Sequence, residues 1–185
     1  VFSADWNRQR VTESNARLVW SPMQSEHKID ELIRSAKHQI QIYNQEFGSY
    51  AMMKAMESDV ARGVKVQLIV PATRYSMYRD ELDAVARKGI EVKLQKHLYT
   101  HAKAMLIDYG YPDARTFVGS MNFSYSGLNK NRELGMVVHN AVVNARLHGV
   151  FQQDWLRAKA LTIKPVVQAS STSCTQQQCV VHLPR

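Results

Sequence analysis

The chain has 185 residues and 45% of them are hydrophobic, which suits one globular domain with a sizeable core. Its 24 Lys and Arg residues outnumber its 16 Asp and Glu residues, so the formal net charge is +8, and this excess favours an anionic partner: phospholipid, nucleic acid or a phosphorylated small molecule. No apolar stretch is long enough for a membrane span, which leaves a protein that is soluble or peripheral to a membrane. The compartment stays open, with the bacterial envelope and secretion among the alternatives.

The first half of the chain alternates between helical and extended patterns. Residues 25–38 carry apolar side chains at helical spacing, with Ser25 as the expected N-cap. The following segments are expected, in chain order, to be a strand over 39–44, a helix over 49–61, a strand over 64–70, a helix over 76–88 and a strand over 90–94. This order predicts an α/β fold with a mixed, mainly parallel sheet flanked by helices.

The second half predicts strands over 102–108, 115–119 and 133–138, and a closing helix over 141–157. The polar segment over 159–185 lacks periodicity and is expected to be a disordered tail. Its Cys174 and Cys179 fit exposed thiols better than a small disulfide loop or a metal site, so no metal is expected.

The beginning of the chain resembles its closing helix. Val1–Arg8 and Val150–Arg157 share Val, Phe, Asp, Trp and Arg at matching positions. Such a repeat indicates a duplicated unit, so residues 1–17 are interpreted as the end of a preceding unit and a linker, with 18–158 as the main domain.

The densest chemical signal lies at His101 and Lys103. The residues around them favour a strand, where side chains i and i+2 share a face about 6 to 7 Å apart. Histidine can attack phosphorus or carry a proton, and lysine can hold phosphate oxygens by its charge. The pair therefore predicts a catalytic site for phosphodiesters that needs no cofactor.

Three more polar residues follow this pair. Ser120 and Asn122 repeat the i, i+2 spacing and are expected to bind substrate oxygens, or else to be turn residues after Gly119. Glu133 is expected to accept a hydrogen bond from the His101 ring and so fix its tautomer, unless it pairs only with neighbouring cations.

Other residues near the pair are less informative. Asp108 differs in parity from His101, which favours a structural or turn-closing role. Glu46 follows a predicted strand and either lines the cleft or ends the strand in solvent. His97 and Tyr99 precede the pair and fit a surface loop slightly better than a substrate contact.

Together these residues resemble a known family. His-x-Lys-x4-Asp over 101–108, Gly-Ser-x-Asn over 119–122 and Glu133 resemble the HKD motif of the phospholipase D superfamily. The intervals over 18–155 are most similar to the C-terminal half of a bacterial two-HKD protein of the cardiolipin synthase type. The resemblance implies a phospholipase D-like fold with a single HKD unit.

The resemblance also implies a mechanism. In that family one histidine attacks phosphorus to form a phosphohistidine, while a second HKD histidine protonates the leaving alcohol. This chain has one such motif. The other is expected either from an upstream half of the same protein or from a second copy in a homodimer.

The substrate expected first is a phospholipid at a membrane surface, hydrolysed by a phospholipase D reaction or used in phosphatidyl transfer. The alternative is a metal-independent endonuclease that acts on DNA or RNA as a homodimer. A binding module without catalysis ranks third, since every motif residue is present.

Overall fold

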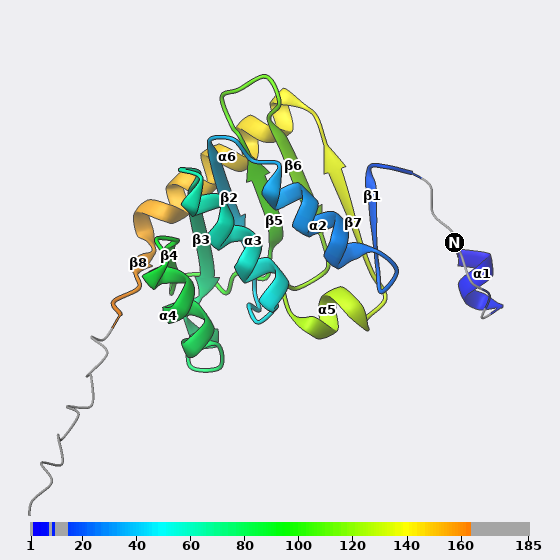
Figure 1. Ribbon diagram of the computed structural model, residues 1–185, viewed down its shortest axis with the longest axis horizontal. Helices are drawn as coiled ribbons and strands as arrows, with labels where there is room; N and C mark the ends of the chain where they lie inside the picture. Colours follow the sequence, from blue (N-terminus) through cyan, green and yellow to red (C-terminus); the bar gives the residue numbers. More distant parts are fainter. Residues whose placement is uncertain (1, 8, 10–14, 164–185) are drawn as a thin grey trace, which may run out of the picture.

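The computed structural model describes residues 2–7, 9 and 15–163, and shows one sheet between two layers of helices (Figure 1). The strands are β1 (Leu18–Ser21), β2 (Gln39–Tyr43), β3 (Lys65–Pro71), β4 (Glu91–Gln95), β5 (Lys103–Ile107), β6 (Arg115–Gly119), β7 (Glu133–Val138) and β8 (Lys159–Ala160). The helices are α1 (Phe2–Trp6), α2 (Ser25–Arg34), α3 (Tyr50–Ala61), the 3-10 helix η1 (Ala72–Arg74), α4 (Arg79–Arg87), α5 (Tyr125–Asn129) and α6 (Ala141–Arg157).

The sheet is mixed, as predicted, with the strand order β1-β7-β6-β5-β2-β3-β4-β8, but its described strand pairs are mainly antiparallel and not mainly parallel as expected. Parallel pairing is limited to β2 with β3 and β3 with β4, the two pairs joined by the helical crossovers α3 and α4. The other described strand pairs are antiparallel, and of these β5 and β6 are consecutive strands joined by a short loop.

Helices α2, α3 and α4 cover one face of the sheet, and α6 covers part of the other (Figure 1). The main core lies under α2 and α3, where Ile29, Ile33, Met52 and Met56 are fully buried against the sheet. On the other face Phe151 of α6 packs against β2 and β3. Met52 and Met56 of α3 are therefore core residues.

Local details differ from the expectations. Ser25 does not cap α2: the N-cap is Gln24, and the buried Ser25 hydroxyl donates to the carbonyl oxygen of Leu128, tying α2 to α5. Ser49 instead caps α3 by accepting from the backbone N–H of Met52. Strand β1 and helix α5 were not predicted, because both are short and lack a clear period.

The folded unit also extends past residue 158. Lys159 and Ala160 form β8, which pairs antiparallel with β4, so the boundary expected at that point falls inside the sheet. Residues 164–185, with Cys174 and Cys179, lie outside the described residues.

The residues predicted to form the site lie at one edge of the sheet, where strands begin or end. Because β5 runs antiparallel to β2 and β6, its first residue lies beside the last residues of those strands. Glu133 begins β7 at this same edge. Within the part of the chain described, no helix is long and apolar enough to cross a membrane.

Candidate active site

Two side chains at the start of β5 meet at this edge. The Lys103 ammonium lies 3.0 Å and 3.2 Å from the two ring nitrogens of His101 and donates to the His101 carbonyl oxygen at 2.8 Å. Lys103 is 5% exposed, whereas His101 is exposed to solvent. The spacing of the motif thus places an accessible imidazole on a buried cation.

Gln45, which the sequence pattern did not single out, holds this cation. Its side-chain oxygen, just after β2, accepts from Lys103 Nζ at 2.8 Å. Burial lowers the pKa of Lys103, and the nearby carboxylates Glu46 and Glu133 partly offset this effect. The signal available in the sequence was the polar run Asn44-Gln45-Glu46 after a buried strand.

Ser120 and Glu133 form a separate group. The Ser120 hydroxyl donates to the Glu133 carboxylate and accepts from the backbone N–H of Leu134 at 3.2 Å. Asn131 also donates to Glu133, at 3.5 Å. Within residues 15–163 no hydrogen bond joins Glu133 to His101, so the predicted orienting contact is not made in this arrangement.

Ser120 and Asn122 do not continue one strand, because β6 ends at Gly119. Met121 between them is fully buried, and the Asn122 side-chain oxygen is buried with no partner among the described residues. Asn122 lies where the backbone N–H of Phe123 donates to Asn44 at the end of β2. The two predicted donors therefore reach the edge from a loop.

Two glycines, Gly119 of β6 and Gly135 of β7, allow these strands to approach closely beside this loop. A Cβ at Gly135 would overlap the Phe117 ring, and one at Gly119 would lie 2.9 Å from the Gly135 Cα. The two glycines are register partners across β6 and β7. The close approach lets the buried Phe117 ring fill the space under the site.

Asp108 lies at the opposite end of β5 from His101. Its carboxylate accepts from the backbone N–H groups of Lys37, His38 and Gln39 at 2.9, 2.8 and 3.0 Å. It is 1% exposed, and its φ of 51° lies in the left-handed region that Asp tolerates. The geometry is that of a turn-closing residue outside the site.

Glu46 is half-buried at the edge where Gln45 holds Lys103. Its backbone N–H donates to the Asn44 side chain at 3.3 Å, and its charge acts on Lys103. Glu46 also contributes, after burial, to the raised pKa of Tyr78. Glu46 therefore lies close enough to Lys103 for their charges to interact, and its role as a cleft residue stays a prediction.

Tyr99 extends the site on one side. Its ring lies 6.2 Å from the His101 ring, centroid to centroid, at an interplanar angle of 29°. Its hydroxyl oxygen accepts from Gln45 at 2.6 Å and from Arg74 at 3.3 Å. These two donors, Arg74 first, lower the pKa of Tyr99. The loop placement was expected, but the contact with the pair His101 and Lys103 was not.

The arrangement suits phosphoryl chemistry. An exposed imidazole can reach phosphorus, and a buried ammonium beside it can neutralise phosphate oxygens in a medium where charge interactions are strong. No group of three or more His, Cys, Asp or Glu residues able to hold a metal ion occurs in the described part of the chain.

Comparisons with known proteins agree with the fold. Residues 29–155 match the family described as "Cardiolipin synthase, PLD-like domain". The 5′-3′ exonuclease PLD3 of Bos taurus is 27% identical over 115 residues, which are 59% of this chain and 23% of that protein. The chain thus spans less than a quarter of this curated relative.

Two solved structures with different names share the fold. Nuc from Salmonella typhimurium, a phospholipase D family member, has a TM-score of 0.70 at 23% identity, covering 78% of this chain and 96% of that one. Phosphatidylserine synthase of Haemophilus influenzae has a TM-score of 0.63 at 14% identity, covering 78% of this chain and 39% of that one. With a family model matching more than half of its length, this chain belongs to the phospholipase D superfamily, among the cardiolipin synthase PLD-like domains.

Proposed function

We propose that this chain supplies one of two half-sites for phosphodiester cleavage through a phosphohistidine on His101. The observation that carries the proposal is the exposed His101 ring lying against the buried Lys103 ammonium. A ring nitrogen of His101 attacks phosphorus and forms the N–P bond while the P–O bond to the leaving group breaks. Water then attacks phosphorus, releases the product and restores the imidazole.

Proton transfer calls for a second half-site. The leaving oxygen needs a proton, and the attacking water must lose one, while His101 is bonded to phosphorus. A histidine from a second HKD unit would perform both transfers. That unit comes from an upstream half of the same protein or from a second copy of this chain.

The other predicted residues take supporting roles. Lys103 binds the non-bridging oxygens, and Gln45 holds its ammonium in place. Ser120 and Asn122 donate to the phosphate once it displaces their present contacts. Glu133 balances the charge of Lys103 and orients an imidazole when the two half-sites meet.

The substrate favoured by the surface of this edge is a nucleic acid. Three exposed tyrosines near the half-site each have a cation beside them: Lys54 lies 5.4 Å from the Tyr50 ring, Lys130 lies 5.3 Å from the Tyr125 ring, and Arg74 donates to Tyr99. Interleaved aromatic and basic side chains suit the bases and phosphates of a single strand. Arg74 and Tyr99 are brought together only by the fold, and the sequence alone favours a phospholipid.

A phospholipid is the second candidate, and one observation favours it. A largely apolar cavity lined by Pro71, Leu98 and Tyr99 opens beside the half-site, as an enzyme that takes up part of a lipid would require. The matching family model is also described as a cardiolipin synthase domain. Phospholipase D hydrolysis or phosphatidyl transfer therefore stays a prediction.

The test is phosphodiesterase activity in the presence of EDTA, measured in parallel on single-stranded DNA and on phosphatidylcholine vesicles. The chain alone and a longer protein with the upstream half are both assayed. We expect cleavage of DNA, its loss in His101→Ala, and a phosphorylated intermediate that is stable in alkali and labile in acid. Arg146→Ala, which removes an exposed cation on α6, serves as the matched control and retains full activity.

The outcomes separate the candidates. Activity on vesicles alone would make the phospholipid the substrate and exclude the nucleic acid. A His101→Ala protein that kept wild-type turnover would overturn the proposed mechanism for either substrate.

A further inference from the structure

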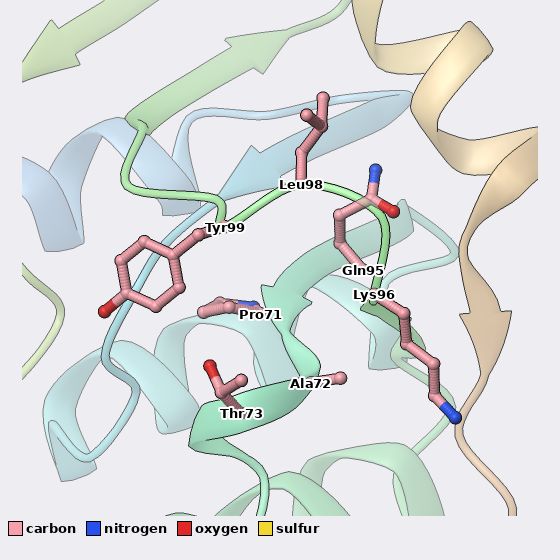
Figure 2. Close-up of a pocket in the computed structure, with 7 residues that line it drawn as sticks. All are labelled: Pro71, Ala72, Thr73, Gln95, Lys96, Leu98 and Tyr99. Carbon is pink, nitrogen blue, oxygen red and sulfur yellow. The ribbon is translucent and has the colours of Figure 1, made fainter.

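A cavity of about 300 Å³ lies next to the half-site, between the end of β3 and the loop after β4. Figure 2 shows Tyr99 and Leu98 projecting from that loop in different directions, with Pro71 at the end of β3 and Thr73 in η1. Tyr99 separates this cavity from His101, since its ring lines the first and stacks near the second. A ligand in the cavity would therefore be a direct neighbour of the reacting phosphate.

The lining combines flat apolar surfaces with polar groups. Tyr99 and Leu98 are 55% and 65% exposed, so these large apolar side chains are open to a ligand. Thr73 adds an exposed hydroxyl, and Gln95 adds a carboxamide. Gln95 is 3% exposed, and its Oε1 has no hydrogen-bond partner in the part of the chain that is described. Because this oxygen is buried without a partner, a ligand donor that reached it after a turn of the Gln95 side chain would gain a hydrogen bond.

The hydrogen bonds of Tyr99 determine where its own proton points. Lys103 donates to Gln45 Oε1, so the amide nitrogen of Gln45 must face Tyr99 and donate to its oxygen. Arg74 donates to the same oxygen. The Tyr99 O–H is then left to donate to an acceptor outside this chain of contacts, such as a phosphate oxygen at the half-site.

Arg74 supplies the charge for a second anion. Its guanidinium donates to Tyr99 with one nitrogen, and Arg74 adjoins Thr73, which lines the cavity. A guanidinium has five N–H donors in a planar fork, so donors remain for a phosphate that follows the scissile one. An acyl chain would use neither this cation nor the Gln95 carbonyl.

We propose that this cavity, with Arg74 at its rim, is a subsite for the nucleotide next to the scissile phosphate. The base lies on Tyr99 against Pro71 and Leu98, its edge faces Gln95, and its own phosphate binds Arg74. This assignment rests on the proposed nuclease function. It deepens that function, because it makes recognition depend on a base and a flanking phosphate.

The experiment measures binding by titration calorimetry, so it does not depend on a second half-site. The probes are deoxythymidine 3′,5′-bisphosphate, inorganic phosphate and dihexanoyl phosphatidic acid. We expect the bisphosphate to bind the wild-type chain at least tenfold more tightly than inorganic phosphate, since one stacked base contributes about 1 to 3 kcal/mol.

Variants test the individual contacts. Arg74→Ala and Tyr99→Ala should each remove most of this tenfold preference, and Tyr99→Phe should retain the larger part because it keeps the ring. Arg146→Ala, the matched loss of an exposed arginine, should leave the preference unchanged. Circular dichroism and the melting temperature show whether each variant is folded.

Every outcome decides between alternatives. An equal preference in wild type, Arg74→Ala and Tyr99→Ala would overturn the subsite, and so would a preference for the phosphatidic acid over the bisphosphate, which would assign the cavity to a lipid. Lys103→Met should abolish binding of all three probes. If it does not, the proposed half-site fails, while the bisphosphate preference still reports on the subsite.

Discussion

Lys103 uses all of its hydrogen-bonding capacity within the protein. An ammonium has three N–H donors, and in Lys103 they face Gln45 Oε1, the His101 carbonyl oxygen and the His101 ring. A phosphate oxygen must therefore replace one of these partners. The ring is the partner that can move, because His101 is exposed while Gln45 is buried. Substrate binding would then turn the imidazole from Lys103 toward phosphorus.

We expect the third residue of the motif, Asp108, to act on stability and not on chemistry. Asp108→Ala should leave three backbone N–H groups at residues 37–39 without their acceptor and lower the free energy of unfolding by about 3 kcal/mol. Asp108→Asn, which keeps one acceptor oxygen, should cost less. Denaturant titration measures both effects.

Asp113→Ala is the matched control, since this carboxylate meets only the exposed Lys37 ammonium. It should leave the unfolding midpoint nearly unchanged. An Asp108→Ala protein of wild-type stability that had lost its activity would place Asp108 in the reaction and contradict the structural role.

At the scale of elements, periodic segments were predicted well and short ones were not. The helices α3 and α6 and the strands β2 to β7 lie within a few residues of their expected ranges, because a buried face imposes a period on the sequence. Helix α5, with five residues, owes its place to contacts with α2 and β1, and such contacts leave no local pattern.

The same holds for the site: its local contacts were predictable from the sequence, and its long-range contacts were not. The pair His101 and Lys103 follows from strand alternation, which is local. The Glu133 contact with Ser120 depends on the register of β6 and β7, and Gln45 reaches Lys103 across β2 and β5. A single sequence does not specify these distant pairings.

The pairing of β6 with β7 depends on Gly135. In Gly135→Ala the added methyl would overlap the Phe117 ring, which is fully buried, so overpacking should destabilise the protein by about 1 to 3 kcal/mol. Because Glu133 and Ser120 flank this contact, phosphate binding should weaken as well. Thermal unfolding and calorimetry would report the two effects.

Gly149→Ala is the control for the methyl group itself. Gly149 lies in α6 with nothing within 4 Å of an added Cβ, so alanine should stabilise the helix by about 0.5 to 1 kcal/mol. If both variants had the same stability as wild type, the close approach of β6 and β7 would not constrain the fold.

At the scale of the molecule, the described residues leave part of one sheet face beside the half-site exposed. Val118, Leu134 and Met136 alternate with the inward-facing residues of β6 and β7 and are between 42% and 47% exposed. Val118 and Met136 are direct register partners. This apolar strip adjoins Ser120 and Glu133, where the mechanism requires a second histidine. A second copy of the chain placed on the strip would bring its own His101 toward the same cleft.

Self-association of the isolated chain tests that arrangement. Sedimentation velocity over a range of concentrations should show a dimer, and Met136→Glu should weaken it at least tenfold, because the dimer would bury an unpaired carboxylate. Leu156→Glu, at an exposed apolar position on α6 outside the strip, should not change it. DNA cleavage by the isolated chain should fall in parallel with the dimer fraction. A wild-type chain that stayed monomeric at every concentration yet cleaved DNA would show that the second half-site is not another copy on this face.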